Sequence, residues 1–335
     1  MGLKEAQRYL CSQENITCFR QHSSTATTVL LYIIFITGIL LATFGNLIVI
    51  ISISHFKNLY TPTNVLTLSL AVTDFLIGLC DMPVMMVKAV DECWYLHEIV
   101  CMALVFYHTA LTSTSVTHLI FLAIDRYFAV CYPLIYMTKM TTRRAWLFAA
   151  ISWLYPILYT IFICHYTFET LYSADHHCQG TCAINVYYTI QTVDLILAYI
   201  LPLTVIIAAY SKIFFVAAEH ARAIRLAKHA GKTLGKKQVK SVQNQHKATV
   251  TIGVLVSTFI VCVSPLYLCQ FIEGYTGIST FVRSALQYFY LFNFAFNPII
   301  YGLFYPWFRK ALKIIATCNI FKTDSSLMNL FPQHF

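Results

Sequence analysis

The sequence predicts an all-α membrane protein, a seven-transmembrane helix bundle followed by a short amphipathic C-terminal helix. Of its 335 residues, 58% are hydrophobic and only 11% are charged, which excludes an ordinary soluble globular protein. Seven apolar stretches are each long enough to cross a hydrocarbon layer about 30 Å thick, for which about 20 helical residues suffice. Lysine and arginine gather on one side of these stretches, as they do on the cytoplasmic side of membrane proteins.

The apolar stretches must form helices, because lipid offers no hydrogen bonds to an open backbone. We place them at residues 28–54, 63–88, 98–131, 144–166, 187–216, 247–272 and 282–303. Prolines inside the last four are expected to kink their helices: Pro156, Pro202, Pro265 and Pro298. Residues 1–27 do not show the pattern of a cleaved signal peptide, so we expect the first span to direct membrane insertion.

The distribution of charge sets the expected orientation. Of the 23 Lys and Arg residues, five lie on the N-terminal side of the membrane, and a dense cluster on the opposite side runs from Arg222 to Lys247. The positive-inside rule therefore predicts an extracellular segment 1–27, a seven-span domain 28–303 and a cytoplasmic segment 304–335. The basic cluster can contact anionic membrane lipid, a protein partner, or both. Asn15-Ile16-Thr17 in the outer segment is a glycosylation acceptor.

The segment after the seventh span has the pattern of an interfacial helix. Tyr305–Thr317 interleaves aromatic and aliphatic residues with Arg309, Lys310 and Lys313. This pattern predicts an amphipathic helix that lies in the membrane interface. Cys318, just beyond it, is a candidate palmitoylation site.

Several cysteines lie on the predicted outer side. Cys101 opens the third span and Cys182 lies in the loop before the fifth, so we expect a Cys101–Cys182 disulfide in an oxidising compartment. Cys178 is a second thiol in the same loop. Cys18, or alternatively Cys11, could bridge to Cys178 and fasten the N-terminal segment over the bundle.

Two signatures occupy the inner ends of the third and seventh spans. They read Asp125-Arg126-Tyr127 and Asn297-Pro298-Ile299-Ile300-Tyr301. Arginine keeps its charge in a protein, so Arg126 at the membrane boundary needs a carboxylate, water or a partner protein to pair with. The two signatures together favour a bundle that signals by moving its inner ends.

With these signatures the chain resembles the rhodopsin-like G-protein-coupled receptors over essentially its whole length. The matching residues follow the order of the spans: Asn46, Asp74, Asp125-Arg126-Tyr127, Trp153, Pro202 with Tyr210, Phe259 with Pro265, and Asn297-Pro298-Ile299-Ile300-Tyr301. The resemblance implies a multi-pass plasma-membrane receptor and not an enzyme. It also implies that the sixth helix moves outward, so that Arg126, Tyr210 and Tyr301 rearrange and admit a heterotrimeric G protein.

The chain is also similar to one subfamily, the trace amine-associated receptors. Residues 293–308 read Asn-Phe-Ala-Phe-Asn-Pro-Ile-Ile-Tyr-Gly-Leu-Phe-Tyr-Pro-Trp-Phe, which fits the seventh-span fingerprint of that subfamily except that Phe294 replaces the usual Ser. Ser54-His55-Phe56-Lys57 and Cys93-Trp94-Tyr95 are similar as well. The resemblance implies a small cationic amine as ligand, olfactory expression and a G protein of the stimulatory class.

The position that usually anchors the amine is changed in this chain. From His108 to Arg126 is 18 residues, or five helical turns, so both lie on one face of the third span. Amine receptors usually have an Asp at the His108 position to pair with the ligand ammonium. They usually have a supporting Tyr at the Leu291 position. The loss of both residues predicts a relocated binding site.

Asp194 in the fifth span is the replacement that we expect. It lies eight residues before Pro202, about 12 Å further out, among apolar neighbours. A carboxylate in such surroundings is costly to keep charged and marks a functional site by default. A fish-type branch of the subfamily has an acidic residue here, which implies an amine bound in a flipped orientation. The alternative is an internal pair of Asp194 with His108 or with a hydroxyl.

Other residues are expected to line the same pocket. Asp81, two residues before Pro83, would suit a diamine or a polar amine. The remaining predicted ligand contacts are Thr109, Thr112, Tyr267, Tyr288 and Leu291, together with His108. Aromatic faces among them would attract an ammonium ion.

A polar cluster is expected between the pocket and the inner end. Asp74, Ser115, Asn293 and Asn297 match the residues that hold a sodium ion in this receptor class. A lone buried carboxylate needs a cation or hydrogen bonds. We expect no other cofactor, and no nucleic acid among the partners. Val263 takes the position of the usual Trp before Pro265.

Three other functions remain to be weighed. A non-amine ligand stays open because of His108. A transporter would favour glycine-broken helices or inverted repeats. A membrane enzyme would need His and carboxylate side chains clustered at one depth, and the sequence shows neither pattern.

Overall fold

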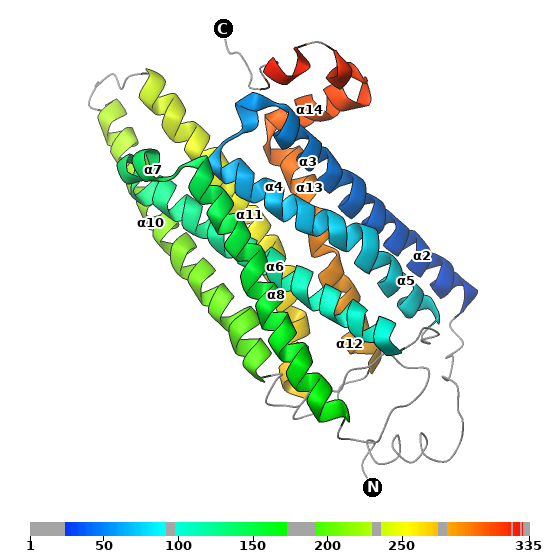
Figure 1. The fold of residues 1–335 in the computed structure, drawn as a ribbon. Helices are drawn as coiled ribbons and strands as arrows, with labels where there is room; N and C mark the ends of the chain where they lie inside the picture. Colours follow the sequence, from blue (N-terminus) through cyan, green and yellow to red (C-terminus); the bar gives the residue numbers. More distant parts are fainter. Residues whose placement is uncertain are drawn as a thin grey trace, which may run out of the picture.

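The fold is a bundle of helices, as the sequence predicts. A computed structural model describes residues 24–91, 98–172, 192–229, 236–273, 280–322, 324–328 and 330, and these contain helices and turns but no strand. The long helices run side by side, and the last helix lies across one end of the bundle (Figure 1). Within the described residues, six helical stretches are long and apolar enough to cross a membrane.

The first two spans and their connection occupy residues 25–91. The first comprises α2 (Thr25–Leu40), the π-helical segment η1 (Leu41–Gly45) and α3 (Asn46–His55), and the second comprises α4 (Pro62–Leu76), the π-helical η3 (Ile77–Asp81) and α5 (Met82–Asp91). The 3-10 turn η2 (Lys57–Leu59) joins them. Side-chain capping of α4 by Thr61, with Pro62 at its first turn, explains why the second span begins there.

The remaining elements follow in chain order. They are α6 (Glu98–Cys131), α7 (Pro133–Lys139), α8 (Thr142–Tyr172), the π-helical η4 (Leu195–Ile200), α10 (Leu201–His229), α11 (Lys236–Glu273), α12 (Thr280–Leu291), α13 (Asn293–Phe304), α14 (Pro306–Ala316), η5 (Asn319–Phe321) and η6 (Ser325–Leu327).

The boundaries of the last three spans differ from those predicted. The α10 and α11 helices continue well past residues 216 and 247, so much of the expected inner loop 217–246 is helical. The seventh span, expected as one helix over 282–303, is two helices that meet at a turn on Phe292. There the backbone switches to i→i−3 hydrogen bonds, from Phe292 N to Phe289 O (3.2 Å) and from Ala295 N to Phe292 O (3.0 Å).

The wide π turns are a second feature that hydropathy does not reveal. Segment η3 ends at Asp81, two residues before Pro83, and η4 ends at Ile200, two residues before Pro202. Proline has no N–H and its ring crowds the carbonyl four residues earlier, so the preceding turn opens. Each added residue rotates the residues before it by about 100° around the helix axis, because an ideal turn holds 3.6 residues.

Two glycines allow the first span to touch its neighbours closely. A Cβ on Gly45 would lie 2.6 Å from Pro298 Cβ, and a Cβ on Gly78 would lie 2.7 Å from Ala42 Cβ and 2.9 Å from Thr43 N. The backbone of η1 therefore touches both the backbone of η3 and the ring of Pro298 in α13. Only a residue without a Cβ permits that approach.

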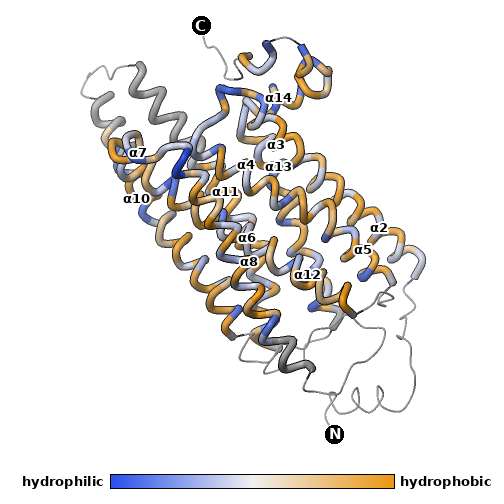
Figure 2. Tube along the Cα trace, in the orientation of Figure 1, coloured by the Kyte–Doolittle hydropathy of each residue, from blue (hydrophilic) through white to orange (hydrophobic). Residues whose placement is uncertain are grey.

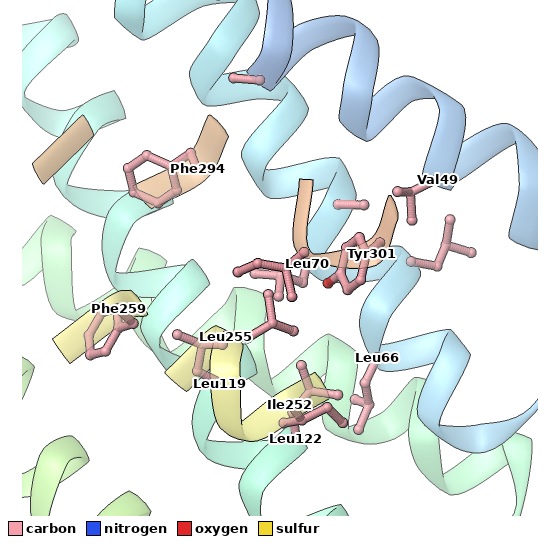
Figure 3. Packing of buried hydrophobic residues seen from close by; sticks show 14 of the residues in the cluster. Val49, Leu66, Leu70, Leu119, Leu122, Ile252, Leu255, Phe259, Phe294 and Tyr301 are labelled. Carbon is pink, nitrogen blue, oxygen red and sulfur yellow. The ribbon is translucent and has the colours of Figure 1, made fainter. Parts of the chain in front are cut away.

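Apolar side chains fill the centre of the bundle and also cover its outside. Figure 3 shows the inner part of the core, where side chains of α3, α4, α6, α11 and α13 meet: Val49, Leu66, Leu70, Leu119, Leu122, Ile252, Leu255, Phe259, Phe294 and Tyr301. Hydrophobic residues predominate along the helices, and a strongly hydrophilic stretch lies near α7 (Figure 2). Leu201 and Phe214 of α10 are among many large exposed apolar residues, as a lipid-facing surface requires.

A buried polar network joins α4, α6 and α8. His118 Nδ1 lies 2.8 Å from the Thr114 carbonyl, which can only accept, so Nδ1 carries the proton. His118 Nε2 then accepts from the Ser69 hydroxyl at 2.7 Å, and Trp153 Nε1 donates to Ser69 Oγ at 3.0 Å. The donors and acceptors of the three side chains can therefore be assigned in only one way.

The predicted amphipathic helix after the seventh span is confirmed as α14, and its place in the membrane interface stays a prediction. Trp307, Phe308 and Ala311 are buried against the bundle, whereas Leu312 and Cys318 are exposed. Arg309 Nη1 donates to the carbonyls of Gly302 and Leu303 at 2.9 Å each, which satisfies acceptors that the end of α13 leaves open.

The chain beyond α14 returns to the first span. His55 Nε2 lies 2.9 Å from Ser325 Oγ, and Leu330 is buried.

Candidate functional site

Asp194 lies at the start of the wide turn η4 and faces tyrosines of two other helices. Tyr159 of α8 donates its hydroxyl to Asp194 Oδ1 at 3.0 Å. The hydroxyl of Tyr267 in α11 approaches the same carboxylate. Tyr267 also stacks on Tyr199, with ring centroids 4.6 Å apart and an interplanar angle of 11°. A hydrogen bond from a hydroxyl stabilises the charged carboxylate, and the stacked rings border it.

The second carboxylate, Asp81, is paired with His108. Asp81 Oδ2 lies 2.8 Å from His108 Nδ1, and the Asp81 side chain is only 1% exposed. Asp81 Oδ1 is buried and has no hydrogen-bond partner among the described residues. The sequence left open a pair between His108 and Asp194. In the structure His108 pairs with Asp81, and Asp194 accepts a hydrogen bond from the hydroxyl of Tyr159 instead.

Tyr290 lies next to His108 and was not expected in the site. It is buried in α12, lies beside the hydroxyl of Thr112 and is within electrostatic range of both Asp81 and Asp194. Its ring lies edge-on to His108, with centroids 6.3 Å apart. Tyr159 was missed as well, because neither residue belongs to a recognisable motif.

The other predicted ligand contacts take different positions. Thr112 Oγ1 donates to the His108 carbonyl at 2.8 Å and to the Thr109 carbonyl at 3.2 Å. Tyr288 packs edge-on against Phe35 of α2, with centroids 5.3 Å apart. Leu291 is fully buried in the core. Their contact with a ligand stays a prediction.

At the predicted inner end, Arg126 is held by α4, α6 and α7. Its Nε donates to Asp125 Oδ2 at 3.0 Å, and its guanidinium also bonds to Thr63 of α4. Tyr136 of α7 donates to Asp125 Oδ1 at 2.7 Å. Burial, and then the Asp125 charge, raise the pKa of Tyr136 to about 12, so this phenol remains a donor at neutral pH. Arg126 thus has the carboxylate partner that the sequence required.

Comparison with known proteins now identifies the family. The model of the 7 transmembrane receptor (rhodopsin family) matches residues 45–301. Trace amine-associated receptor 13c of Danio rerio is 38% identical over 324 residues, covering 95% of this chain and 94% of that protein. Trace amine-associated receptor 4 of Mus musculus is 36% identical (96% and 94% covered), and trace amine-associated receptor 1 of Homo sapiens is 36% identical (95% and 96% covered).

The chain belongs to the trace amine-associated receptors of the rhodopsin family. The predicted family and fold class are thereby confirmed. The protein is a G-protein-coupled receptor of the plasma membrane and not an enzyme. Its orientation and its place in a fish-type branch stay predictions.

The receptor assembles the predicted polar cluster around Asp74. Asn297 Nδ2 donates to Asp74 Oδ2 at 2.6 Å, and Ser115 Oγ donates to Oδ1 at 3.4 Å. Asp74 is completely buried. Asn293 lies one turn before Asn297 on the same face of α13, and its Oδ1 is buried without a hydrogen-bond partner among the residues described.

Two tyrosines of the receptor's inner half carry unpaired hydroxyls. Tyr210 Oη and Tyr301 Oη are both buried, and neither has a hydrogen-bond partner in the described part of the chain. Tyr301 packs against the rings of Tyr305 and Phe308, at centroid distances of 5.9 and 6.5 Å. Tyr127 instead packs edge-on against Phe128 and Tyr132, at 5.4 and 5.8 Å.

The covalent sites are only partly described. Cys101 is disulfide-bonded near the start of α6. Its predicted partner Cys182 lies outside the described residues, as do Cys11, Cys18, Cys178 and Asn15. Cys318 is a free, exposed thiol two residues after the end of α14. Glycosylation, palmitoylation and both disulfide pairings stay predictions.

Proposed function

We propose that this receptor is activated by a small protonated amine whose ammonium is held by Asp194. The observation that supports it most is the placement of an acidic side chain inside the bundle, between Tyr159 and Tyr267. Such a carboxylate is costly to desolvate, and an ammonium ion offsets that cost with an ion pair. The names of the relatives also point to amines.

The aromatic surroundings suit the same ligand. Tyr199 and Tyr267 form a stacked pair next to the carboxylate. A cation near an aromatic face gains about 0.5–2 kcal/mol, more where water is excluded. Leu195, directly after Asp194, packs against the buried apolar core of the bundle. The proposed ligand therefore combines one ammonium group with an apolar body.

The signal would reach a heterotrimeric G protein at the other end. Arg126 is tied to Asp125, Thr63 and Tyr136 in this conformation. A buried unpaired hydroxyl costs about 1–3 kcal/mol, which Tyr210 and Tyr301 recover if they pair when the inner ends move apart. The amine would favour that state by binding it more tightly than the closed one.

A ligand comparison tests the proposal. Cells that express the receptor are exposed to primary amines and to the alcohols of the same carbon skeleton, and cyclic AMP is measured. We expect amines to raise cyclic AMP and the uncharged alcohols to have no effect. Equal responses to alcohols or to carboxylic acids would refute the amine ligand. An amine response through another second messenger would refute only the stimulatory class.

The Asp74 cluster supports a sodium ion as part of the same proposal. A carboxylate, a hydroxyl and the free Asn293 carbonyl oxygen form an all-oxygen donor set, which suits a hard cation. Asp74, Ser115, Asn293 and Asn297 would hold the ion, whose charge would balance that of the buried carboxylate.

Sodium should stabilise the receptor. At a concentration ten times its Kd, a ligand of the folded state adds about 1.4 kcal/mol. We therefore expect sodium chloride to raise the thermal midpoint of the solubilised receptor by a few degrees over choline chloride at equal ionic strength. Asp74→Asn should remove that difference. If Asp74→Asn keeps the full sodium effect, the ion binds elsewhere.

A further inference from the structure

A cavity lies at the predicted inner end of the bundle, where α7 meets α8. Its volume is about 580 Å³, within the range of about 300–1,000 Å³ that is typical of ligand pockets. It is lined by residues from the end of α7, the connection and the first turns of α8: Thr138, Lys139, Thr141, Arg143, Arg144 and Leu147. The proposed amine and sodium sites do not use this basic hollow.

The lining of the basic hollow carries three positive charges and no carboxylate. Lys139, Arg143 and Arg144 are all exposed, and none of them forms an ion pair with a carboxylate of the described residues. A concave surface lined by charges of one sign concentrates ions of the opposite sign. The hollow therefore suits a group with more than one negative charge.

Two hydrogen bonds order the backbone around the basic hollow. Arg144 Nη1 donates to the Lys139 carbonyl at 2.5 Å, which ties the end of α7 to the start of α8. The backbone N–H of Arg144 donates to Thr141 Oγ1 at 3.4 Å, so Thr141 caps α8. The charged groups of Lys139 and Arg143 remain available to a ligand.

Neighbouring side chains place the basic hollow at the level of lipid headgroups. Trp146 Nε1 donates to the Tyr60 hydroxyl at 2.7 Å, and the two residues are 44% and 49% exposed. Exposed Trp and Tyr side chains are enriched where a span meets the membrane interface. The apolar span of α8 follows directly, and Leu147 is 57% exposed on it. An anion in the hollow thus lies beside a surface that suits a hydrocarbon chain.

We propose that the basic hollow binds the phosphorylated headgroup of an anionic membrane lipid. Lys139 and Arg143 pair with phosphate oxygens, to which ammonium and guanidinium groups are strong donors. An acyl chain of the same lipid lies along Leu147. A headgroup with several phosphate charges is preferred to one with a single charge, because three cations line the hollow.

The test measures the lipid affinity of the purified full-length receptor in an uncharged detergent. Fluorescently labelled phosphatidylinositol 4,5-bisphosphate is titrated, and its anisotropy is recorded. We expect Lys139→Gln combined with Arg143→Gln to weaken the affinity about tenfold or more, because each cation near an anionic lipid contributes about fivefold. Labelled phosphatidylserine, with its single net charge, should bind the wild type more weakly than the phosphoinositide does.

Two matched variants control this result. Lys57→Gln combined with Lys322→Gln removes two exposed cations outside the hollow, so the affinity should stay close to that of the wild type. Lys139→Arg combined with Arg143→Lys keeps both charges and should retain most of the affinity. Because all four positions are exposed, the thermal midpoints without added lipid should agree, which shows that each variant is folded.

Three results would overturn the lipid site. The first is wild-type affinity in the Lys139→Gln, Arg143→Gln variant, or an equal loss in the Lys57→Gln, Lys322→Gln control. The second is equally tight binding of the water-soluble inositol trisphosphate headgroup, which would leave the hydrocarbon surface without a role. The third is a Lys139→Gln, Arg143→Gln variant that binds the lipid normally but fails to activate G protein in phosphatidylcholine nanodiscs, which would assign the cations to the protein partner. None of these results depends on the amine.

Discussion

Replacing Asp194 by Asn is expected to raise the half-maximal concentration of amine agonists at least about a hundredfold. The exchange preserves the shape of the side chain and removes the anion, so a bound ammonium would be desolvated without a counter-charge. Loss of a buried charged partner costs about 3 kcal/mol or more, and each 1.4 kcal/mol is tenfold in affinity. Concentration–response curves for cyclic AMP at matched surface levels measure the effect.

Two further variants control this result. Asp194→Glu keeps the charge and should retain part of the response. Tyr159→Phe removes one hydrogen bond to Oδ1 and leaves the anion, so we expect a loss of about three- to tenfold. If Asp194→Asn at normal surface level responds to amines as the wild type does, the ammonium binds another group.

Replacing Gly78 by Val should strongly destabilise the receptor. Even the first added carbon would lie 2.7 Å from Ala42 Cβ and 2.9 Å from Thr43 N, and the latter is backbone that cannot rotate away. Overpacking of this kind costs about 1–3 kcal/mol or more, which lowers cellular abundance several-fold. Surface labelling and the thermal midpoint of the solubilised receptor report the loss.

Gly302→Ala is the matched control for that substitution. Its new carbon would lie 3.7 Å from the nearest atom, on the ring of Phe308, which is an ordinary van der Waals contact. Its expression and thermal midpoint should remain close to those of the wild type. If Gly78→Val is equally well tolerated, η1 and η3 are further apart than described.

The inner half of the receptor was largely predictable from sequence. Regular α-helical spacing and the motifs place Arg126 beside Asp125, and Asn297 beside Asp74, and the structure contains both contacts. All four of these residues lie in regular α-helix, outside the π-helical segments. Regular helix geometry was therefore enough to predict both contacts.

The outer half was less predictable, because its helices are not regular. The wide turns η3 and η4 change the face on which Asp81 and Asp194 lie relative to the prolines that follow them. The break at Phe292 does the same for Tyr290. A helical wheel drawn from Pro83, Pro202 or Pro298 consequently misplaces these side chains. It cannot reveal that His108 meets Asp81, or that Tyr159 meets Asp194.

The network of His118, Ser69 and Trp153 bears on how motion in this receptor can be observed. Each of its hydrogen bonds has one possible direction, so sliding α4, α6 or α8 past one another would strand a donor or an acceptor in a dry interior. These three helices should therefore keep their relative positions and can serve as a fixed reference for distance measurements. The outward movement proposed for α11 is then best recorded as distances from probes attached to α4 and α8.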